Sequence, residues 1–166
     1  MLAFLPFIGV QAAKIEGIEW SITKPNFAGE EMNMRVYFSK VKGYNKEFLI
    51  DFDSRVDVPN FGKIYYRGAR LRFYEKKGNT IFIEKSEEDK LYLVVVKVDV
   101  VPSLASTDEK AINDEADKIL EKYKDKIASD LINDEVLIYK VVDKNTLVLQ
   151  YESGESEAFV NADIFR

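Results

Sequence analysis

Short stretches in which apolar and polar residues alternate recur along most of this 166-residue chain. Successive side chains of a β-strand point to opposite faces, so each stretch predicts a strand with one buried face. Aromatic residues, which favour strands, are also frequent, with nine Tyr and eleven Phe. The alternation predicts strands at residues 18–22, 32–38, 48–52, 63–67, 69–75, 80–84, 91–101, 135–142, 146–152 and 158–160.

Two of these predicted strands have further features. Gly68 separates residues 63–67 from residues 69–75, which predicts a bulge or a bend at that glycine. Residues 91–101 are the most apolar stretch, and they begin with apolar side chains on both faces. We therefore expect a central strand that is covered on both sides in its first half. One face of that strand is apolar throughout: Tyr92, Val94, Val96, Val98 and Val100.

One segment has the periodicity of a helix. Its apolar residues recur at steps of three and four: Ile112, Ala116, Ile119, Leu120, Tyr123, Ile127 and Leu131. The opposite side is almost wholly charged, and the spacing of Ser106 and Glu109 predicts a capping box at the start. The elements together predict an α+β fold. We expect a strongly curved antiparallel β-sheet or barrel-like sandwich, with one long amphipathic helix (about 107–133) packed on it.

The first ten residues, MLAFLPFIGV, contain no polar side chain, and the first charge is Lys14. Apolar residues of this kind need to be covered, by a signal-peptide pathway, by lipid or by protein. No basic residue opens the segment, and Pro6 interrupts a run too short for a membrane-spanning helix. We therefore expect residues 1–13 to form an apolar arm on a single β-rich domain of residues 14–166, although a signal remnant remains an alternative.

The arm is expected to dock on a neighbouring subunit, as a strand added to a sheet edge or as a short packed helix. Burial within its own chain is the simpler alternative. The residues expected at the interface are Leu2, Phe4, Leu5, Phe7, Ile8 and Val10.

The composition limits the chemistry that the chain can perform. It contains no Cys and no His, which excludes thiolate catalysis, zinc–thiolate sites and the Ser-His-Asp triad. The phosphate-binding patterns GxxxxGK[ST] and GxGxxG are absent as well. We expect no enzymatic activity and no cofactor. A net charge of −5 also disfavours nonspecific binding to nucleic acid or to an anionic membrane.

Three acidic residues form one candidate site. Asp51, Asp53 and Asp57 lie close together in the sequence, and calcium prefers several carboxylates on one loop. The spacing does not match an EF-hand loop. The simpler interpretation is the solvated face of a strand whose other face is apolar.

A second candidate site combines basic and aromatic side chains. Arg67, Arg70, Arg72 and Tyr74 could bind an anion or a partner, because such residues interleaved on a sheet can bind single-stranded nucleic acid. The alternative is that the arginines pair with acids of neighbouring strands, such as Glu84 and Asp51.

These observations favour a non-enzymatic structural subunit that self-assembles. We expect a homo-oligomer, of the kind found in virion tubes or capsids or in extracellular filaments, and hence a virion or extracellular location rather than a cytoplasmic one. Nucleic acid is not the main expected partner, and no segment is expected to span a membrane. The alternatives are a β-barrel that binds an apolar ligand or a protein partner, and an enzyme that uses Asp, Glu, Lys or Tyr.

Overall fold

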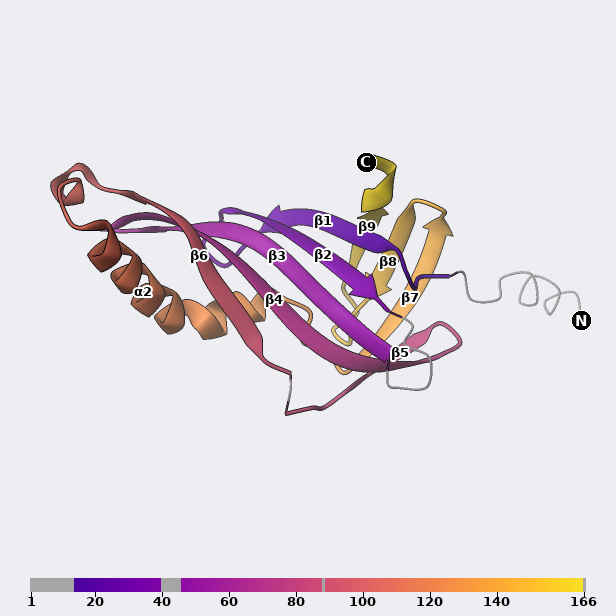
Figure 1. Cartoon of the computed structure of the whole chain (residues 1–166). Helices are drawn as coiled ribbons and strands as arrows, with labels where there is room; N and C mark the ends of the chain where they lie inside the picture. The colour runs from indigo at the N-terminus through magenta and orange to yellow at the C-terminus, as the bar shows by residue number, and fades with distance from the viewer. Residues whose placement is uncertain (1–13, 40–45, 88, 166) are drawn as a thin grey trace, which may run out of the picture.

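Eight antiparallel strands close into a barrel, and a ninth strand and a helix extend from one side of it (Figure 1). The structure is a computed structural model that describes residues 14–39, 46–87 and 89–165. The arm residues expected at an interface lie outside these ranges. The strands are β1 (Glu19–Pro25), β2 (Glu31–Phe38), β3 (Lys46–Val58), β4 (Gly62–Lys77), β5 (Thr80–Glu84), β6 (Leu91–Val100), β7 (Val136–Asp143), β8 (Thr146–Gln150) and β9 (Ser156–Asn161).

The barrel closes because β3, the first strand of the ring, pairs with β4, the last. That order is β3-β2-β1-β9-β8-β7-β5-β4, and β6 follows β4 outside the ring. The predicted α+β fold with a barrel-like sheet is therefore confirmed. Short turns join most neighbouring strands. The helical segments are η1 (Pro102–Leu104), α2 (Glu109–Ser129) and η2 (Ala162–Phe165).

The length of β4 explains how one sheet forms both the barrel and its extension. β4 has 16 residues, and β3 pairs with it from Gly62 to Tyr74 along one edge. The other edge is shared, because β6 pairs with residues 62–70 and β5 with residues 73–77. Thus β5 continues the barrel, while β6 lies on the part of β4 that projects beyond it.

Large apolar side chains fill the barrel. Phe38 and Phe48 stack with their ring centroids 4.6 Å apart, and Tyr74 meets Phe38 edge-on at 5.3 Å. Trp20 and Phe159, from the adjoining strands β1 and β9, are also fully buried. This packing follows from the alternation in the sequence, which places every second side chain inside the barrel.

Helix α2 packs on the extension and covers its inner face (Figure 1). Four members of the predicted apolar stripe are buried: Ala116, Ile119, Leu120 and Ile127. The capping-box prediction was wrong, because Asp108 is the residue before the helix and makes no side-chain cap hydrogen bond. The helix is also shorter than predicted, and the buried Leu131 lies in the segment that follows it.

The predicted break at Gly68 is absent, because β4 runs through this residue without interruption. Gly68 lies opposite Phe52, and a Cβ atom there would be 2.2 Å from Cζ of the Phe52 ring. The glycine leaves room for that ring, and no bulge interrupts the pairing of β3 with β4 there. The irregularity of β4 lies instead between Tyr65 and Tyr66, where its pairing with β6 shifts by one residue.

Candidate interaction surface

The most apolar strand of the chain, β6, lies at an edge of the sheet. Within the described ranges it pairs with β4 alone, and Tyr92, Val94 and Val96 are 60%, 63% and 58% exposed. The expectation of a central, doubly covered strand was therefore wrong. The backbone groups along the outer edge of β6 have no strand partner among the described residues, and three large apolar side chains project beside them.

A β-bulge explains why the sequence of β6 resembles that of a central strand. Tyr66 pairs with Val95 and Tyr65 with Lys97, so Val96 has no partner on β4. An extra residue reverses the alternation of side chains. Leu91, Leu93 and Val95 face inward before the bulge, and Val98 and Val100 do so after it. The apolar side chains at even-numbered positions therefore point outward before the bulge and inward after it. In the sequence these positions look like one continuous apolar face.

The outer face formed by β1, β2 and β3 carries charged side chains that pair with one another, whereas the first half of β6 carries none. Arg35 Nε lies 3.2 Å from Asp51 Oδ2, and its Nη1 donates to Asp53 Oδ2 at 3.0 Å. Burial lowers the pKa of Arg35, but hydrogen bonds to these two carboxylates outweigh it and raise that pKa overall. Glu19 lies 3.8 Å from the same guanidinium.

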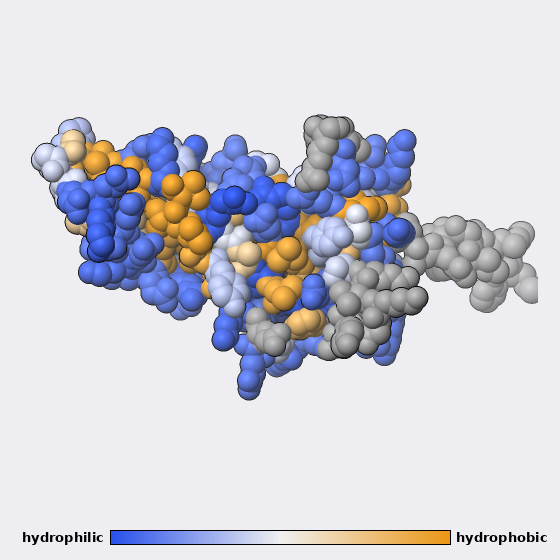
Figure 2. Space-filling model, viewed as in Figure 1, coloured by the Kyte–Doolittle hydropathy of each residue, from blue (hydrophilic) through white to orange (hydrophobic). Residues whose placement is uncertain are grey.

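Figure 2 shows the contrast, with a hydrophobic band along β6 beside the hydrophilic surface of α2. β6 supplies no charge before Lys97, because residues 91–96 read LYLVVV, and Arg67 of β4 is the charged side chain opposite Val94. A surface that combines an open strand edge with a continuous apolar row is typical of a binding site for another polypeptide.

A groove runs beside the second half of β6. It has a volume of about 370 Å³ and lies between residues 96–100 of β6 and residues 104–113, which include the start of α2. Val98, Leu104 and Ile112 line it, and Lys97 and Glu109 are also in its wall. The edge of β6 is thus open along its first half and bordered by a groove along its second half.

Two of the three carboxylates of the predicted cation site are engaged in ion pairs. Asp51 and Asp53 lie on the partly exposed face of β3, as the simpler interpretation had it, and both pair with Arg35. Asp57 lies at the exposed end of the strand, opposite Lys63. Among the described residues, no group of three or more Asp or Glu side chains is arranged to hold a metal ion.

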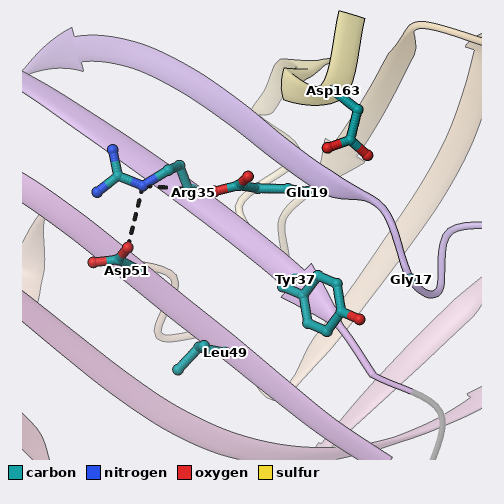
Figure 3. Close-up of a pocket in the computed structure, with 7 residues that line it drawn as sticks. All are labelled: Gly17, Glu19, Arg35, Tyr37, Leu49, Asp51 and Asp163. Carbon is teal, nitrogen blue, oxygen red and sulfur yellow. Dashed lines mark hydrogen bonds and ion pairs between the residues drawn. The ribbon is translucent and has the colours of Figure 1, made fainter. Parts of the chain in front are cut away.

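Asp51 and Arg35 instead line a shallow hollow of about 280 Å³ on the outside of the barrel (Figure 3). Tyr37 and Leu49, each 38% exposed, form its apolar part. Glu19 and Asp163 complete its acidic rim. The charged side chains of Arg35, Asp51 and Glu19 in its wall are engaged with one another, so a structural role accounts for them.

The predicted basic patch is divided between two faces of β4. Arg67 is exposed on the outer face, whereas Arg70, Arg72 and Tyr74 share the inner face. Arg72 is 4% exposed and Tyr74 is 1% exposed. The four side chains therefore do not form one accessible surface.

The two inner arginines hold the segment that follows α2. Arg70 binds both carboxylate oxygens of Asp89, at 2.6 and 3.1 Å, and Arg72 Nε reaches the same carboxylate at 3.2 Å. Arg72 Nη1 donates to the backbone carbonyls of Ile132 and Asp134. Arg70 and Arg72 therefore pair with an acid, as the alternative interpretation held, and that acid is Asp89, while Asp51 pairs with Arg35. Burial, followed by the charge of Arg70, lowers the pKa of Arg72.

Sequence reasoning missed a buried ion pair where the described chain begins. Ile15 is fully buried, and its carbonyl accepts a hydrogen bond from Trp20 Nε1 at 3.2 Å. Glu16 lies 2.7 Å from Lys76 Nζ and 3.9 Å from Lys46 Nζ. Burial raises the pKa of Glu16, but hydrogen bonds from Lys76 and from the backbone, with the Lys76 charge, lower that pKa overall. Residues 15–16 are therefore anchored in the barrel end.

The fold and this surface define an antiparallel β-barrel with a helix-covered extension and an open strand edge. A comparison with models of known protein families gives no match, and a comparison with curated protein sequences gives none either. Within the described part of the chain, no helix has the length and hydrophobicity that crossing a lipid bilayer requires.

Proposed function

We propose that this protein is a non-enzymatic structural subunit whose copies assemble through the open edge of β6. The observation that carries the proposal is the row of Tyr92, Val94 and Val96 on a strand that, among the described residues, has a partner on one side only. Edge strands are usually protected by charges, prolines or covering segments. The first six residues of β6 contain no charge and no proline.

The burial energy of the apolar row can be compared with the free-energy cost of association. Complete burial of a side chain of this size contributes about 1.5–3 kcal/mol. Association costs roughly 4–15 kcal/mol in lost translational and rotational freedom. Three side chains that are already partly covered match only the lower part of that cost. Hydrogen bonds to the backbone groups on the outer edge of β6, as in strand addition, would add to the contact.

An apolar ligand inside the barrel is the less favoured function. Trp20, Phe38, Phe48 and Phe159 occupy the interior and are fully buried, and the two hollows described above lie outside it. The enzymatic alternative would require two facing groups in a pocket, and Asp51 is already paired with Arg35. A turnover that responded to substitution of Asp51 or Asp53 would contradict the non-enzymatic assignment.

Assembly by head-to-tail strand addition generates rings, tubes or fibres. We therefore propose a homo-oligomer of the type found in virion tubes or capsids or in extracellular filaments. The proposal places the protein in one of those two settings.

The test is the native mass of three proteins in solution. We expect the unmodified chain to exceed its monomer mass of 19.1 kDa. Val94→Lys should reduce the mass to that of a monomer, because it places a charge in the apolar row. Val142→Lys is the matched control, since Val142 is a valine of β7 that is 56% exposed. An unmodified chain that is monomeric at high concentration would refute the proposal.

A further inference from the structure

We infer that the segment that adds to β6 is residues 1–10 of a second copy of this chain. This inference rests on the proposed function, because it names the occupant of the same strand edge. It is argued from the chemistry of the segment, from its length and from the place where the described chain begins.

The segment and the strand match in chemistry and in length. Residues 1–10 carry no polar side chain, and residues 91–96 carry no charge. Arg67 of β4, which pairs with Val94, is the charge beside this row, so a charged peptide would lose hydration along most of the row, whereas apolar side chains gain burial there. β6 has ten residues, so a segment of ten residues in extended form covers its whole edge.

Pro6 determines how such a segment can pair. Proline has no N–H group, so it is tolerated in a strand only where its nitrogen points away from the ladder. With Pro6 in that position, the backbone groups of the odd-numbered residues face β6 and those of the even-numbered residues face outward. The added segment becomes the new edge of the sheet, and Pro6 on that edge disfavours addition of a further strand. One edge would therefore accept one arm.

The anchored start of the domain favours a second copy over the chain's own edge. Ile15 and Glu16 are held at the β1 side of the barrel, and β2, β3 and β4 separate β1 from β6 (Figure 1). Four strand spacings amount to roughly 19 Å around the outside of the sheet. Residues 11–14 span at most about 14 Å when extended. Residues 1–10 cannot then lie along the full length of their own β6.

The groove beside β6 favours a single strand over a second β6 edge. Residues 104–113 border the second half of the strand, so two edges placed together would bring two such segments into contact. A single extended segment avoids this. Its side chains can enter the groove and contact Leu104 and Ile112, while those on the opposite face extend the row of Tyr92 and Val94.

Disulfide trapping between two copies tests the inference, and the cysteine-free chain makes each introduced thiol unique. One full-length protein carries Ala3→Cys or Ile8→Cys, and a second, differently tagged protein carries Val94→Cys. We expect a mixed disulfide dimer under mild oxidation, formed about tenfold or more in excess of the same experiment with Val142→Cys, because docking raises the local thiol concentration. Equal yields with Val94→Cys and Val142→Cys would overturn the inference.

A deletion separates this inference from the proposed function. We expect removal of residues 1–10 to reduce the protein to a folded monomer, as Val94→Lys does. If Val94→Lys abolishes assembly and the deletion does not, the edge is an interface but the arm is not its occupant. If neither change affects assembly, both proposals fail. A disulfide between residues 8 and 94 that forms only within one chain, at high dilution, would show that the arm covers its own edge.

Discussion

The closed barrel and the β3–β4–β6 extension contain the same kind of strand, but they solve the problem of strand edges differently. In the barrel every strand has two neighbours, so its backbone groups are paired and its apolar faces meet in one interior. In the extension α2 covers one face, and within the described part of the chain one edge of β6 has no strand partner, with Tyr92, Val94 and Val96 beside it. Ring closure therefore pairs every strand edge of the barrel, whereas the strand left outside the ring is the one that we propose for assembly.

The largest expected effect is the loss of an aromatic ring from the barrel. Phe48→Ala removes a fully buried ring that stacks on Phe38, so we expect a loss of about 3–5 kcal/mol in the free energy of unfolding. Tyr92→Ala on β6 should change that free energy by less than about 0.5 kcal/mol in the monomer. Urea unfolding of both variants measures the contrast. Similar losses would show that β6 is covered within its own chain.

The second prediction concerns the helix that joins the two regions. Leu120 is 3% exposed against the sheet, so Leu120→Ala should destabilise the domain by about 2–5 kcal/mol. Glu121→Ala on the solvent side of α2 should have little effect. Chemical denaturation followed by circular dichroism distinguishes the two. Equal, small effects would mean that α2 folds without contributing to the core of the extension.

A smaller effect is expected where β3 and β4 pass from the barrel into the extension. Gly68→Ala introduces a methyl group against the ring of Phe52, and overpacking of this kind costs about 1–3 kcal/mol. The double variant Gly68→Ala with Phe52→Leu should lose less than the sum of its single changes, because the smaller side chain relieves the clash. Thermal unfolding of all three variants tests this, and additive losses would contradict the steric explanation.

The smallest expected effect is a dependence of stability on pH at the barrel end. The pKa of Glu16 is lower in the folded state than its ordinary value of 4.5, so its contribution is present above that value. It is lost as the pH falls toward the lowered pKa. We expect Glu16→Gln to be less stable than the unmodified chain by about 1–2 kcal/mol at pH 7 and to approach it at pH 3. Unfolding measured at both pH values checks the sign, and an unchanged difference would contradict it.

Most of the fold was predictable from local patterns. The alternation in β2 and the helical stripe from Ala116 to Ile127 each depend on residues a few positions apart, which the sequence displays directly. Interruptions were harder to interpret. In the sequence Gly68 predicts a break in a strand, but a glycine reports missing volume equally well, and only the position of Phe52 across the ladder distinguishes the two.

The candidate sites depended on partners that are remote in the sequence. The pairing of Arg72 with Asp89 and with carbonyls after α2 joins residues 17 or more positions apart. The buried Glu16 and its partner Lys76 on β4 are separated in the sequence by β1, β2 and β3. Local spacing identified residues capable of ion pairing, but it could not show which charge would meet which.

The sequence by itself determined the periods of the elements, and hence the antiparallel strands, the single amphipathic helix and the exclusion of Cys and His chemistry. Only the tertiary structure decided the position of β6. Its residues 91–100 are apolar enough for a central strand, and burial would have satisfied them equally well. The length of β4, the closure of the ring through β5 and the unpaired Val96 placed this strand outside the barrel. Strand order is set by nonlocal pairing, which leaves no periodic signal in the chain.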